Sequence, residues 1–274
     1  MNRRTATTAS AAERGQVNTE AAEVYDAVFV PALFGQFPGL VLDHAGVSVG
    51  ERVLDVGCGT GILARASRRI VGAAGEVVAI DPNEAMLSIA RRSDRSIDWH
   101  SGVAESLPFL DGAFDHTISQ FAAMFFTDRT AALSEMARAT RGGGTVTIAT
   151  WAGLDRTPGY EAMVGVVRDV LGEPAASALC APFTLGDTAD VRRLLATIGS
   201  NLRVDELAGT ARFASIADWV RTDVRGWTLA DLVDDDAESV LVEHAERELA
   251  SFVSACGSVA FPTPALVGTV IVDH

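Results

Sequence analysis

The sequence predicts an α/β fold in which parallel strands alternate with helices. The main observation is the apolar run Val53–Val56, which is followed at once by three glycines at alternate positions and then by helical spacing from Ile62 to Arg69. A second apolar run, Val77–Ile80, is again followed by helical spacing. Short apolar runs of this kind are typical of buried parallel strands, and a strand, a helix and a second strand in succession form a βαβ unit.

The remaining elements follow from the same patterns. Runs rich in β-branched residues predict strands, and apolar residues three and four positions apart predict helices. Pro31 should interrupt the first helix, the run Arg141–Gly144 should stop a helix, and Asp187 or Thr188 should cap another. The predicted strands are 53–56, 76–80, 97–100, 114–119, 145–150, 202–208 and 264–272. The predicted helices are 18–33, 39–45, 60–70, 83–92, 129–140, 161–171, 187–198, 216–225 and 237–255.

The turn Gly57–Gly61 predicts a nucleoside site. Glycines after a strand allow a ligand to approach the backbone, and the following helix presents free N–H groups. Asp81 ends the second strand 20 residues after Gly61 (81 − 61), a spacing that brings a carboxylate to a ribose. Asp55 precedes the first glycine by two residues. A carboxylate there would repel a pyrophosphate and attract an ammonium group. S-adenosylmethionine has an ammonium group, a ribose and no phosphate.

Two other interpretations of this turn remain open. A dinucleotide site has the pattern G-x-G-x-x-G, whereas this chain has G-x-G-x-G, with Ile62 at the position of the third glycine of that pattern. Together with Asp55, this departure counts against a nicotinamide dehydrogenase, which would also need a catalytic Tyr/Lys or His/Asp pair. The turn could also be a structural strand-to-helix connection that binds no ligand.

The segment Val53–Gly61 resembles motif I of the class I S-adenosylmethionine-dependent methyltransferases. The similarity is closest to the ubiquinone/menaquinone-biosynthesis-like (type 11) small-molecule branch and extends over roughly Tyr25 to Trp151. The resemblance implies a three-layer Rossmann-like fold with a seven-stranded, mostly parallel sheet, an antiparallel last strand and helical lid insertions. We expect a flexible tail at 1–16 and one domain at 17–274. Its core would cover roughly 46–156, 187–210 and 259–273, and its lid helices roughly 17–45, 157–186 and 214–256.

The resemblance also implies roles for single residues. Asp81 would hold both ribose hydroxyls, Tyr25 would close over the methionine end of the cofactor, and Gln120 would face its methyl group. Val103 replaces the acid that accepts from the adenine amine in the family, so Glu105, a backbone carbonyl or water must meet that amine. The predicted cofactor-binding residues are Tyr25, Asp55, Gly57, Cys58, Gly59, Gly61, Asp81, Pro82, Met86, Val103, Ala104, Glu105 and Gln120.

The methyl acceptor is expected to be an apolar small molecule. The segment Ala122–Phe126 is too apolar for a free loop, and Phe34–Phe37 is a second apolar segment. The predicted substrate-pocket residues are Phe34, Phe37, Phe121, Met124 and Phe125. No triad or paired-carboxylate constellation has a convincing spacing, so no catalytic residue is assigned. His244, on a predicted lid helix, is the one histidine considered as a general base, although a solvated helix face is its more common role.

Composition narrows the classes of partner. The net charge is −14, which argues against nucleic acid as a substrate. All 22 basic residues are arginine, which excludes lysine chemistry. The three cysteines, Cys58, Cys180 and Cys256, lack the spacing of a metal site, so no metal is expected, and reduced thiols in the cytoplasm are the simplest interpretation. No apolar run has the length of a membrane span. The chain should be a monomer or homodimer.

The sequence therefore predicts a methyltransferase that uses S-adenosylmethionine, gives S-adenosylhomocysteine as product, and methylates an oxygen, nitrogen or carbon nucleophile. The motifs concern cofactor binding only. A fold that binds S-adenosylmethionine for a non-methylating reaction, or as an accessory subunit, is therefore the alternative.

Overall fold

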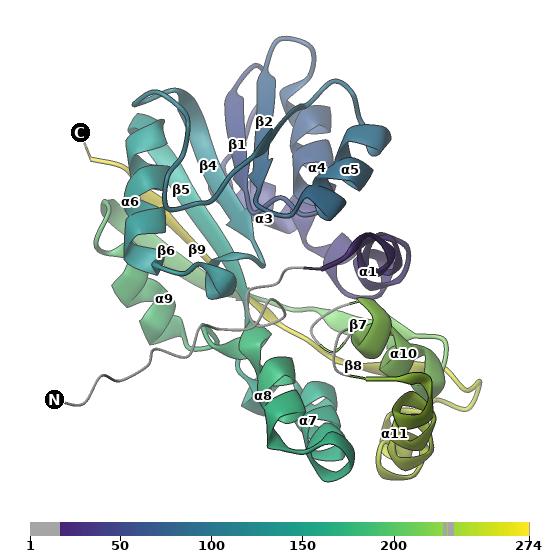
Figure 1. Ribbon diagram of the computed structural model, residues 1–274. Coiled ribbons are helices and arrows are strands. Elements are labelled where there is room, and N and C mark those ends of the chain that lie inside the picture. The colour runs from purple at the N-terminus through teal and green to yellow at the C-terminus, as the bar shows by residue number, and fades with distance from the viewer. Residues whose placement is uncertain (1–16, 227–228, 230–232, 274) are drawn as a thin grey trace, which may run out of the picture.

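The computed structural model of the chain describes residues 17–226, 229 and 233–273, so the expected tail at 1–16 lies outside the described residues. Seven strands form one sheet in the order β3-β2-β1-β4-β5-β9-β6 (Figure 1). The last strand, β9, is antiparallel to both of its neighbours, whereas the pairs from β3 to β5 are parallel. The strands are β1 Arg52–Val56, β2 Glu76–Asp81, β3 Asp98–Ser101, β4 Phe114–Gln120, β5 Thr140–Trp151, β6 Ser200–Leu207 and β9 Ala265–Ile271. This is the predicted fold class.

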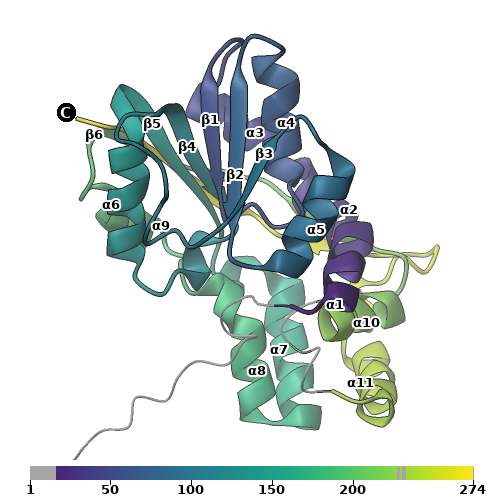
Figure 2. The same cartoon turned by 45° about the horizontal axis from the view of Figure 1, so that its top comes forward.

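Helices cover both faces of the sheet (Figures 1 and 2). One face carries α3, α4 and α5, and the other carries α6 and α9. Several helix starts are fixed by side-chain caps, because the first N–H groups of a helix have no partner within it. Asn83 caps α5, Asp128 caps α6, and Asp187 caps α9. The helices are α3 Pro38–Ala45, α4 Ile62–Val71, α5 Glu84–Ser93, α6 Arg129–Ala139 and α9 Thr188–Leu195.

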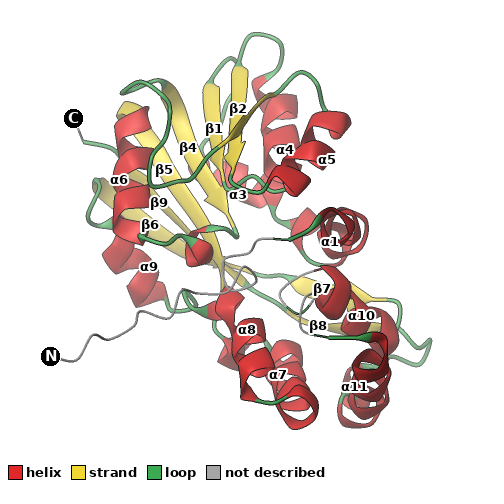
Figure 3. Cartoon of the chain, viewed as in Figure 1, coloured by secondary structure: helices red, strands yellow, loops and turns green. Residues whose placement is uncertain are grey.

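A smaller helical layer lies beside the sheet and includes a two-stranded ribbon, β7–β8 (Figure 3). Within it α7 packs on α8 and α11, and α10 packs on α11 and on the N-terminal α1. Its elements are α1 Thr19–Val24, a π-helical segment Tyr25–Phe29, α2 Val30–Ala32, α7 Pro158–Leu171, α8 Glu173–Cys180, α10 Ile216–Gly226, α11 Asp235–Glu248, β7 Thr210–Phe213 and β8 Val259–Pro262. Short 3₁₀ turns are at Phe34–Gln36, Ala123–Phe125, Leu154–Arg156, Ala181–Phe183 and Ala250–Phe252.

Several details differ from the prediction. The segment Arg141–Gly144 does not stop a helix: α6 ends at Ala139, and the glycines lie within β5, where the ladder with β4 shifts register. Pro31 does not end the helical run, which continues from the π-helical segment Tyr25–Phe29 through α2 to Ala32. Helix α11 ends at Glu248, before the predicted end at 255. The ribbon β7–β8 was not predicted.

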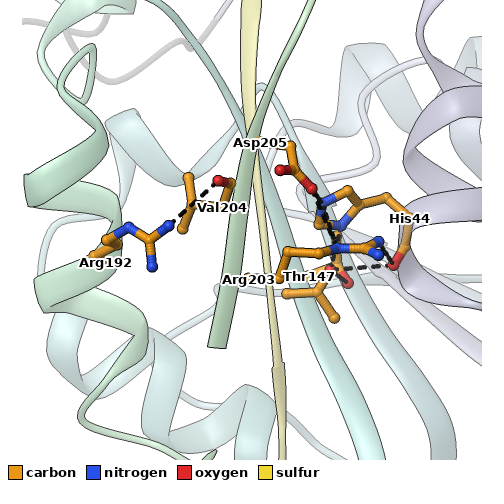
Figure 4. Close-up of polar contacts among 7 residues, drawn as sticks. His44, Thr147, Arg192, Arg203, Val204 and Asp205 are labelled. Atoms are coloured by element: carbon orange, nitrogen blue, oxygen red, sulfur yellow. Dashed lines mark hydrogen bonds and ion pairs between the residues drawn. The ribbon is translucent and has the colours of Figure 1, made fainter. Parts of the chain in front are cut away.

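His44 fixes the position of α3 against the far edge of the sheet (Figure 4). Its Nδ1 lies 2.7 Å from the Thr269 hydroxyl of β9, and its Nε2 lies 3.0 Å from Asp205 Oδ2 of β6. The Arg203 guanidinium donates to the His44 carbonyl at 3.0 Å. Burial lowers the pKa of His44, although the hydrogen bond to the Asp205 carboxylate opposes this shift. These contacts hold α3, and through it the start of β1, in place.

Among the described residues we find no helix with the length and apolarity needed to span a bilayer.

Candidate functional site

A cavity of about 320 Å³ lies at the carboxyl ends of β1, β2 and β4. In parallel sheets this edge is the usual place for a ligand. The turn after β1, the end of β2, the loop after β3 and the segment after β4 all contribute side chains, and Tyr25 and Phe34 close it from the N-terminal helices. The lining residues are Tyr25, Phe34, Asp55, Gly57, Cys58, Gly59, Thr60, Ile62, Leu63, Asp81, Pro82, Met86, Gly102, Val103, Ala104, Glu105, Gln120, Phe121, Ala122, Phe125, Phe126 and Thr127.

All three glycines of the turn after β1 have left-handed backbones, and Gly59 and Gly61 need them for different reasons. Gly59 has φ +54°, and a Cβ there would meet no atom within 4 Å, so the backbone presents an open surface to the cavity. Gly61 has φ +86°, and a Cβ there would lie 2.3 Å from Trp99 Cη2. Only glycine adopts such φ values without cost. Gly59 therefore leaves room for a ligand, whereas Gly61 allows α4 to begin close to β3.

Asp81 ends β2 and is held by backbone donors. Its Oδ2 accepts from the Gly59 N–H at 2.9 Å, and its Oδ1 accepts from the Asn83 N–H at 2.8 Å. The side chain is 8% exposed, and burial raises its pKa to about 6, against these two hydrogen bonds. Each carboxylate oxygen retains a lone pair for a further donor. Asp81 can therefore accept from a vicinal diol without giving up its backbone partners.

Asp55 is the most deeply buried acid of the cavity. It is 1% exposed, and its Oδ2 has no hydrogen-bond partner among the described residues. Burial raises its pKa to about 8, against a backbone hydrogen bond from Ala64. Thr60 Oγ1 and Gln120 Oε1 are also buried, line the same cavity and lack a partner in the described structure. Buried polar atoms without partners cost about 1–3 kcal/mol each, so these three positions fit a polar ligand group.

The aromatic residues form one wall of the cavity. Tyr25 lies on the π-helical segment, with its ring 5.1 Å from that of Phe34. Burial and the nearby Asp81 and Asp26 carboxylates raise the pKa of Tyr25 far above its usual range, so its hydroxyl remains protonated. Tyr25 can thus donate a hydrogen bond or pack against a ligand.

The loop after β3 forms the opposite end. Val103 lines the cavity and is 45% exposed. Glu105 Oε1 accepts from the backbone N–H groups of Thr127 and Asp128 at 2.7 and 3.2 Å. Glu105 therefore connects this loop to the segment before α6, with its carboxylate at the cavity wall.

Phe121, immediately after β4, has φ +56°, an unusual value for a bulky residue that costs about 1–3 kcal/mol. Its ring stacks on Trp151 with centroids 4.0 Å apart. Phe121, Phe34 and Phe125 also line a second, mainly apolar cavity of about 30 Å³. The remaining lining residues of this second cavity are Phe29, Leu33, Trp151, Tyr160, Leu179, Pro182, Phe183, Asp223 and Thr263.

The structure does not bring every predicted residue to the first cavity. Gly61 does not line it and instead faces the Trp99 ring. Phe37 is fully buried and packs edge-on against Phe121 and Trp151, and Met124 is buried outside both cavities. His244 lies on α11, 3.9 Å from Asp169 of α7, and lines neither cavity. All the other predicted cofactor and pocket residues line the first cavity.

Some lining residues were not predicted. Three of them lie next to predicted positions in the sequence, and only this proximity could have indicated them: Thr60, Phe126 and Thr127. Tyr160, Asp223 and Thr263 come together from three separate segments at the second cavity, and no local motif in the sequence marks them.

Comparison with known proteins agrees with this geometry. A family model described as a methyltransferase domain matches residues 54–148. A ubiquinone/menaquinone biosynthesis C-methyltransferase of Hahella chejuensis is 38% identical over 109 residues, which cover 38% of this chain and 44% of that protein. A demethylmenaquinone methyltransferase of Renibacterium salmoninarum is 37% identical over 113 residues, which cover 41% and 46%. The chain thus spans less than half the length of these relatives.

Solved structures share the fold over a larger part of the chain. A putative methyltransferase from an antibiotic biosynthesis pathway of Anabaena variabilis has a TM-score of 0.62 at 18% identity, covering 85% of this chain and 96% of that one. The Haemonchus contortus phosphoethanolamine N-methyltransferase 2 has a TM-score of 0.61 at 16% identity, covering 97% and 61%. The chain therefore shares the fold of these solved structures, and its residues 54–148 match the model of a methyltransferase domain.

Proposed function

We propose that this protein transfers a methyl group from S-adenosylmethionine to an oxygen, nitrogen or carbon nucleophile of an apolar small molecule. The observation that carries the proposal is the buried, unpartnered Oδ2 of Asp55 in a cavity that also contains Asp81. An ammonium group and a ribose would satisfy these two acids. The match of residues 54–148 to a methyltransferase domain supports the same ligand.

The residues present fit this cofactor. Asp55, Thr60 and Gln120 would bind its amino-acid end, and Asp81 would bind its ribose. Val103, Ala104 and Glu105 would lie along its adenine, where Glu105 offers a carboxylate at the cavity wall. A carboxylate at Asp55 disfavours the pyrophosphate of a dinucleotide. The dehydrogenase alternative therefore has no support from the geometry.

Bound S-adenosylmethionine would supply an electrophilic methyl group, so the chain need only position the nucleophile and exclude water. Holding a nucleophile in line with the group that it attacks can lower the activation barrier by roughly 7–11 kcal/mol. Tyr25, Phe34, Phe121 and Phe125 form the apolar wall that would do this. His244 lines neither cavity, so its use as a base finds no support.

Two experiments test the proposal in sequence. Calorimetry with S-adenosylhomocysteine should give one site per chain, and no heat at millimolar ligand would refute the cofactor assignment. Incubation with S-adenosylmethionine carrying a labelled methyl group and a pool of apolar acceptors, demethylmenaquinone among them, should then transfer label. Binding without transfer to any acceptor would favour the non-methylating alternative.

We further propose that the protein works in the cytoplasm, as a monomer or homodimer, on a free small molecule. The described cysteines are all unpaired, and Cys256 is exposed, which supports a reducing environment. Sedimentation of the purified protein would determine the oligomeric state.

A further inference from the structure

The second cavity contains two buried polar groups that the proposed cofactor does not use. Asp223 of α10 is 3% exposed, and Thr263, which follows β8, is 1% exposed. Asp223 Oδ2 and Thr263 Oγ1 have no hydrogen-bond partner within the described part of the chain, and both residues line the cavity. The rest of the lining is almost wholly apolar or aromatic. Polar atoms placed in this way are costly for folding, and they are explained if a ligand pairs with them.

The hydrogen bonding of Asp223 determines what it offers. The Tyr160 hydroxyl lies 3.2 Å from Asp223 Oδ1 and donates to it. Burial raises the pKa of Asp223 to about 8, against the hydrogen-bonding side chains of Tyr160 and Trp219, so the carboxyl group is mostly protonated at neutral pH. With Oδ1 accepting from Tyr160, Oδ2 is the oxygen left to carry this proton and to donate it to a ligand. The Thr263 hydroxyl is a second donor.

The two cavities share a wall. Phe34, Phe121 and Phe125 line both of them, so a molecule in the second cavity lies directly behind the apolar side of the first. The second cavity, at about 30 Å³, has space for little more than one small polar group. An occupant would therefore place one end there and its apolar body along the shared phenyl rings. Its other end would reach the first cavity.

We propose that the second cavity anchors the methyl acceptor, and that Asp223 and Thr263 donate hydrogen bonds to one oxygen of an uncharged, otherwise apolar molecule. This inference rests on the proposed methyl transfer and deepens it by naming the substrate class. The anchored oxygen is distinct from the atom that is methylated, so Asp223 is a specificity-determining residue. Two donors facing an apolar space match a carbonyl oxygen, which has two lone pairs.

The test uses two probes that differ in one group: acetophenone, which has a C=O, and α-methylstyrene, which has C=CH₂ in the same place. Binding is measured by ligand-detected NMR titration, with and without S-adenosylhomocysteine. The wild-type protein should prefer acetophenone by about tenfold, which corresponds to one to two hydrogen bonds. The variant Asp223→Leu should lose the preference, Thr263→Val should reduce it, and Asp223→Asn, which retains a donor, should keep part of it.

Asp218→Asn is the matched control, because Asp218 lies on the same helix but outside this cavity, and it should keep the full preference. All four variants should bind S-adenosylhomocysteine as the wild type does, which shows that each has folded. Equal binding of the two probes, or binding of neither, would overturn this inference. If S-adenosylhomocysteine still bound in that case, the proposed function would stand. A preference for α-methylbenzylamine over acetophenone would also overturn it, in favour of an ion pair with Asp223. Probe discrimination without any nucleoside binding would instead refute the proposed function.

Discussion

The backbone N–H of Gly59 donates to Asp81 Oδ2 at 2.9 Å, which joins the turn after β1 to the carboxylate that ends β2. The second oxygen of Asp81 is fixed by the Asn83 N–H at the start of α5. The carboxylate is therefore held in place before a ligand arrives, and less ordering is needed on binding. The same side chain thus shapes the turn and is the one to which we assign the ribose.

Asp81→Asn tests this dual use. The amide keeps one acceptor, but its NH₂ group would face either the Gly59 N–H or the Asn83 N–H, and one hydrogen bond to a diol is lost. We expect the affinity for S-adenosylhomocysteine to fall by about tenfold or more, because a hydrogen bond to a charged group contributes about 1.5–3 kcal/mol. Calorimetry measures the change. Glu76→Gln, at the other end of β2, should leave the affinity unchanged. Equal affinity in Asp81→Asn would remove the ribose assignment.

Two glycine variants should separate binding from folding. In Gly61→Ala, an alanine must adopt a left-handed φ, and its methyl group would clash with the Trp99 ring. This ring cannot easily move, because its Nε1 donates a hydrogen bond to the Asp94 carbonyl. The substitution should therefore lower the free energy of unfolding by about 2–4 kcal/mol. Gly59→Ala has only the cost of its φ, about 1–2 kcal/mol, but its methyl group enters the cavity and should weaken S-adenosylhomocysteine binding more than tenfold. Urea unfolding and calorimetry measure the two effects. The opposite ranking would mean that the nucleoside does not contact Gly59.

The raised pKa of Asp55 predicts pH-dependent binding. With a pKa of about 8, Asp55 is mostly protonated in the free protein at pH 7. An ammonium group favours the carboxylate, so ligand binding should release a proton, and affinity should rise between pH 6 and pH 8. Calorimetry at pH 7 in buffers of different ionisation enthalpy measures that release. In Asp55→Asn the release should disappear. Proton uptake in the wild type would contradict the assignment.

The parallel part of the fold could be predicted because its signals are local. Strands β1 and β2 contain short apolar runs, and the second half of β5 is rich in β-branched residues. The turn chemistry at Gly57–Gly61 and at Asp81 lies within a few residues of β1 and β2. The ribbon β7–β8 lacked such a signal. Its strands are four residues each and pair across about fifty residues of chain, and Pro262 ends one of them, so long-range packing rather than local pattern decides the pairing.

The same distinction applies to the site. Asp55 and Asp81 belong to one βαβ unit, so their spacing in sequence indicates their spacing in the cavity. Tyr160, Asp223 and Thr263 come from α7, α10 and the residue after β8, which only the folded helical layer brings together. Phe37 shows the converse: its apolar neighbourhood predicted a pocket, but its ring fills the core beneath the pocket wall.

Phe37→Ala should therefore affect stability rather than ligand recognition directly. The side chain is fully buried, with its ring 5.2 Å from Phe121 and 5.6 Å from Trp151. Its truncation should lower the free energy of unfolding by about 3–5 kcal/mol through lost contacts and a new cavity. Leu40→Ala, at a position 46% exposed, should change stability by no more than about 0.5 kcal/mol. Urea unfolding compares them. A small effect of Phe37→Ala would place this ring in a flexible pocket wall instead.

Asp223 should make the stability of the protein depend on pH. Its pKa is about 8 in the folded chain and about 3.8 in the unfolded chain, so between these values the folded state holds a proton that the unfolded state has released. The free energy of unfolding then falls as pH rises through this window. Asn cannot lose a proton, so the gain in stability of Asp223→Asn over the wild type should grow from pH 5 to pH 8. Asp55 is present in both proteins, so its own contribution to the pH dependence cancels when the free energy of unfolding of the wild type is subtracted from that of the variant at each pH. Urea unfolding at each pH gives the difference, and a gain that stays constant with pH would show that Asp223 is already charged in the folded protein.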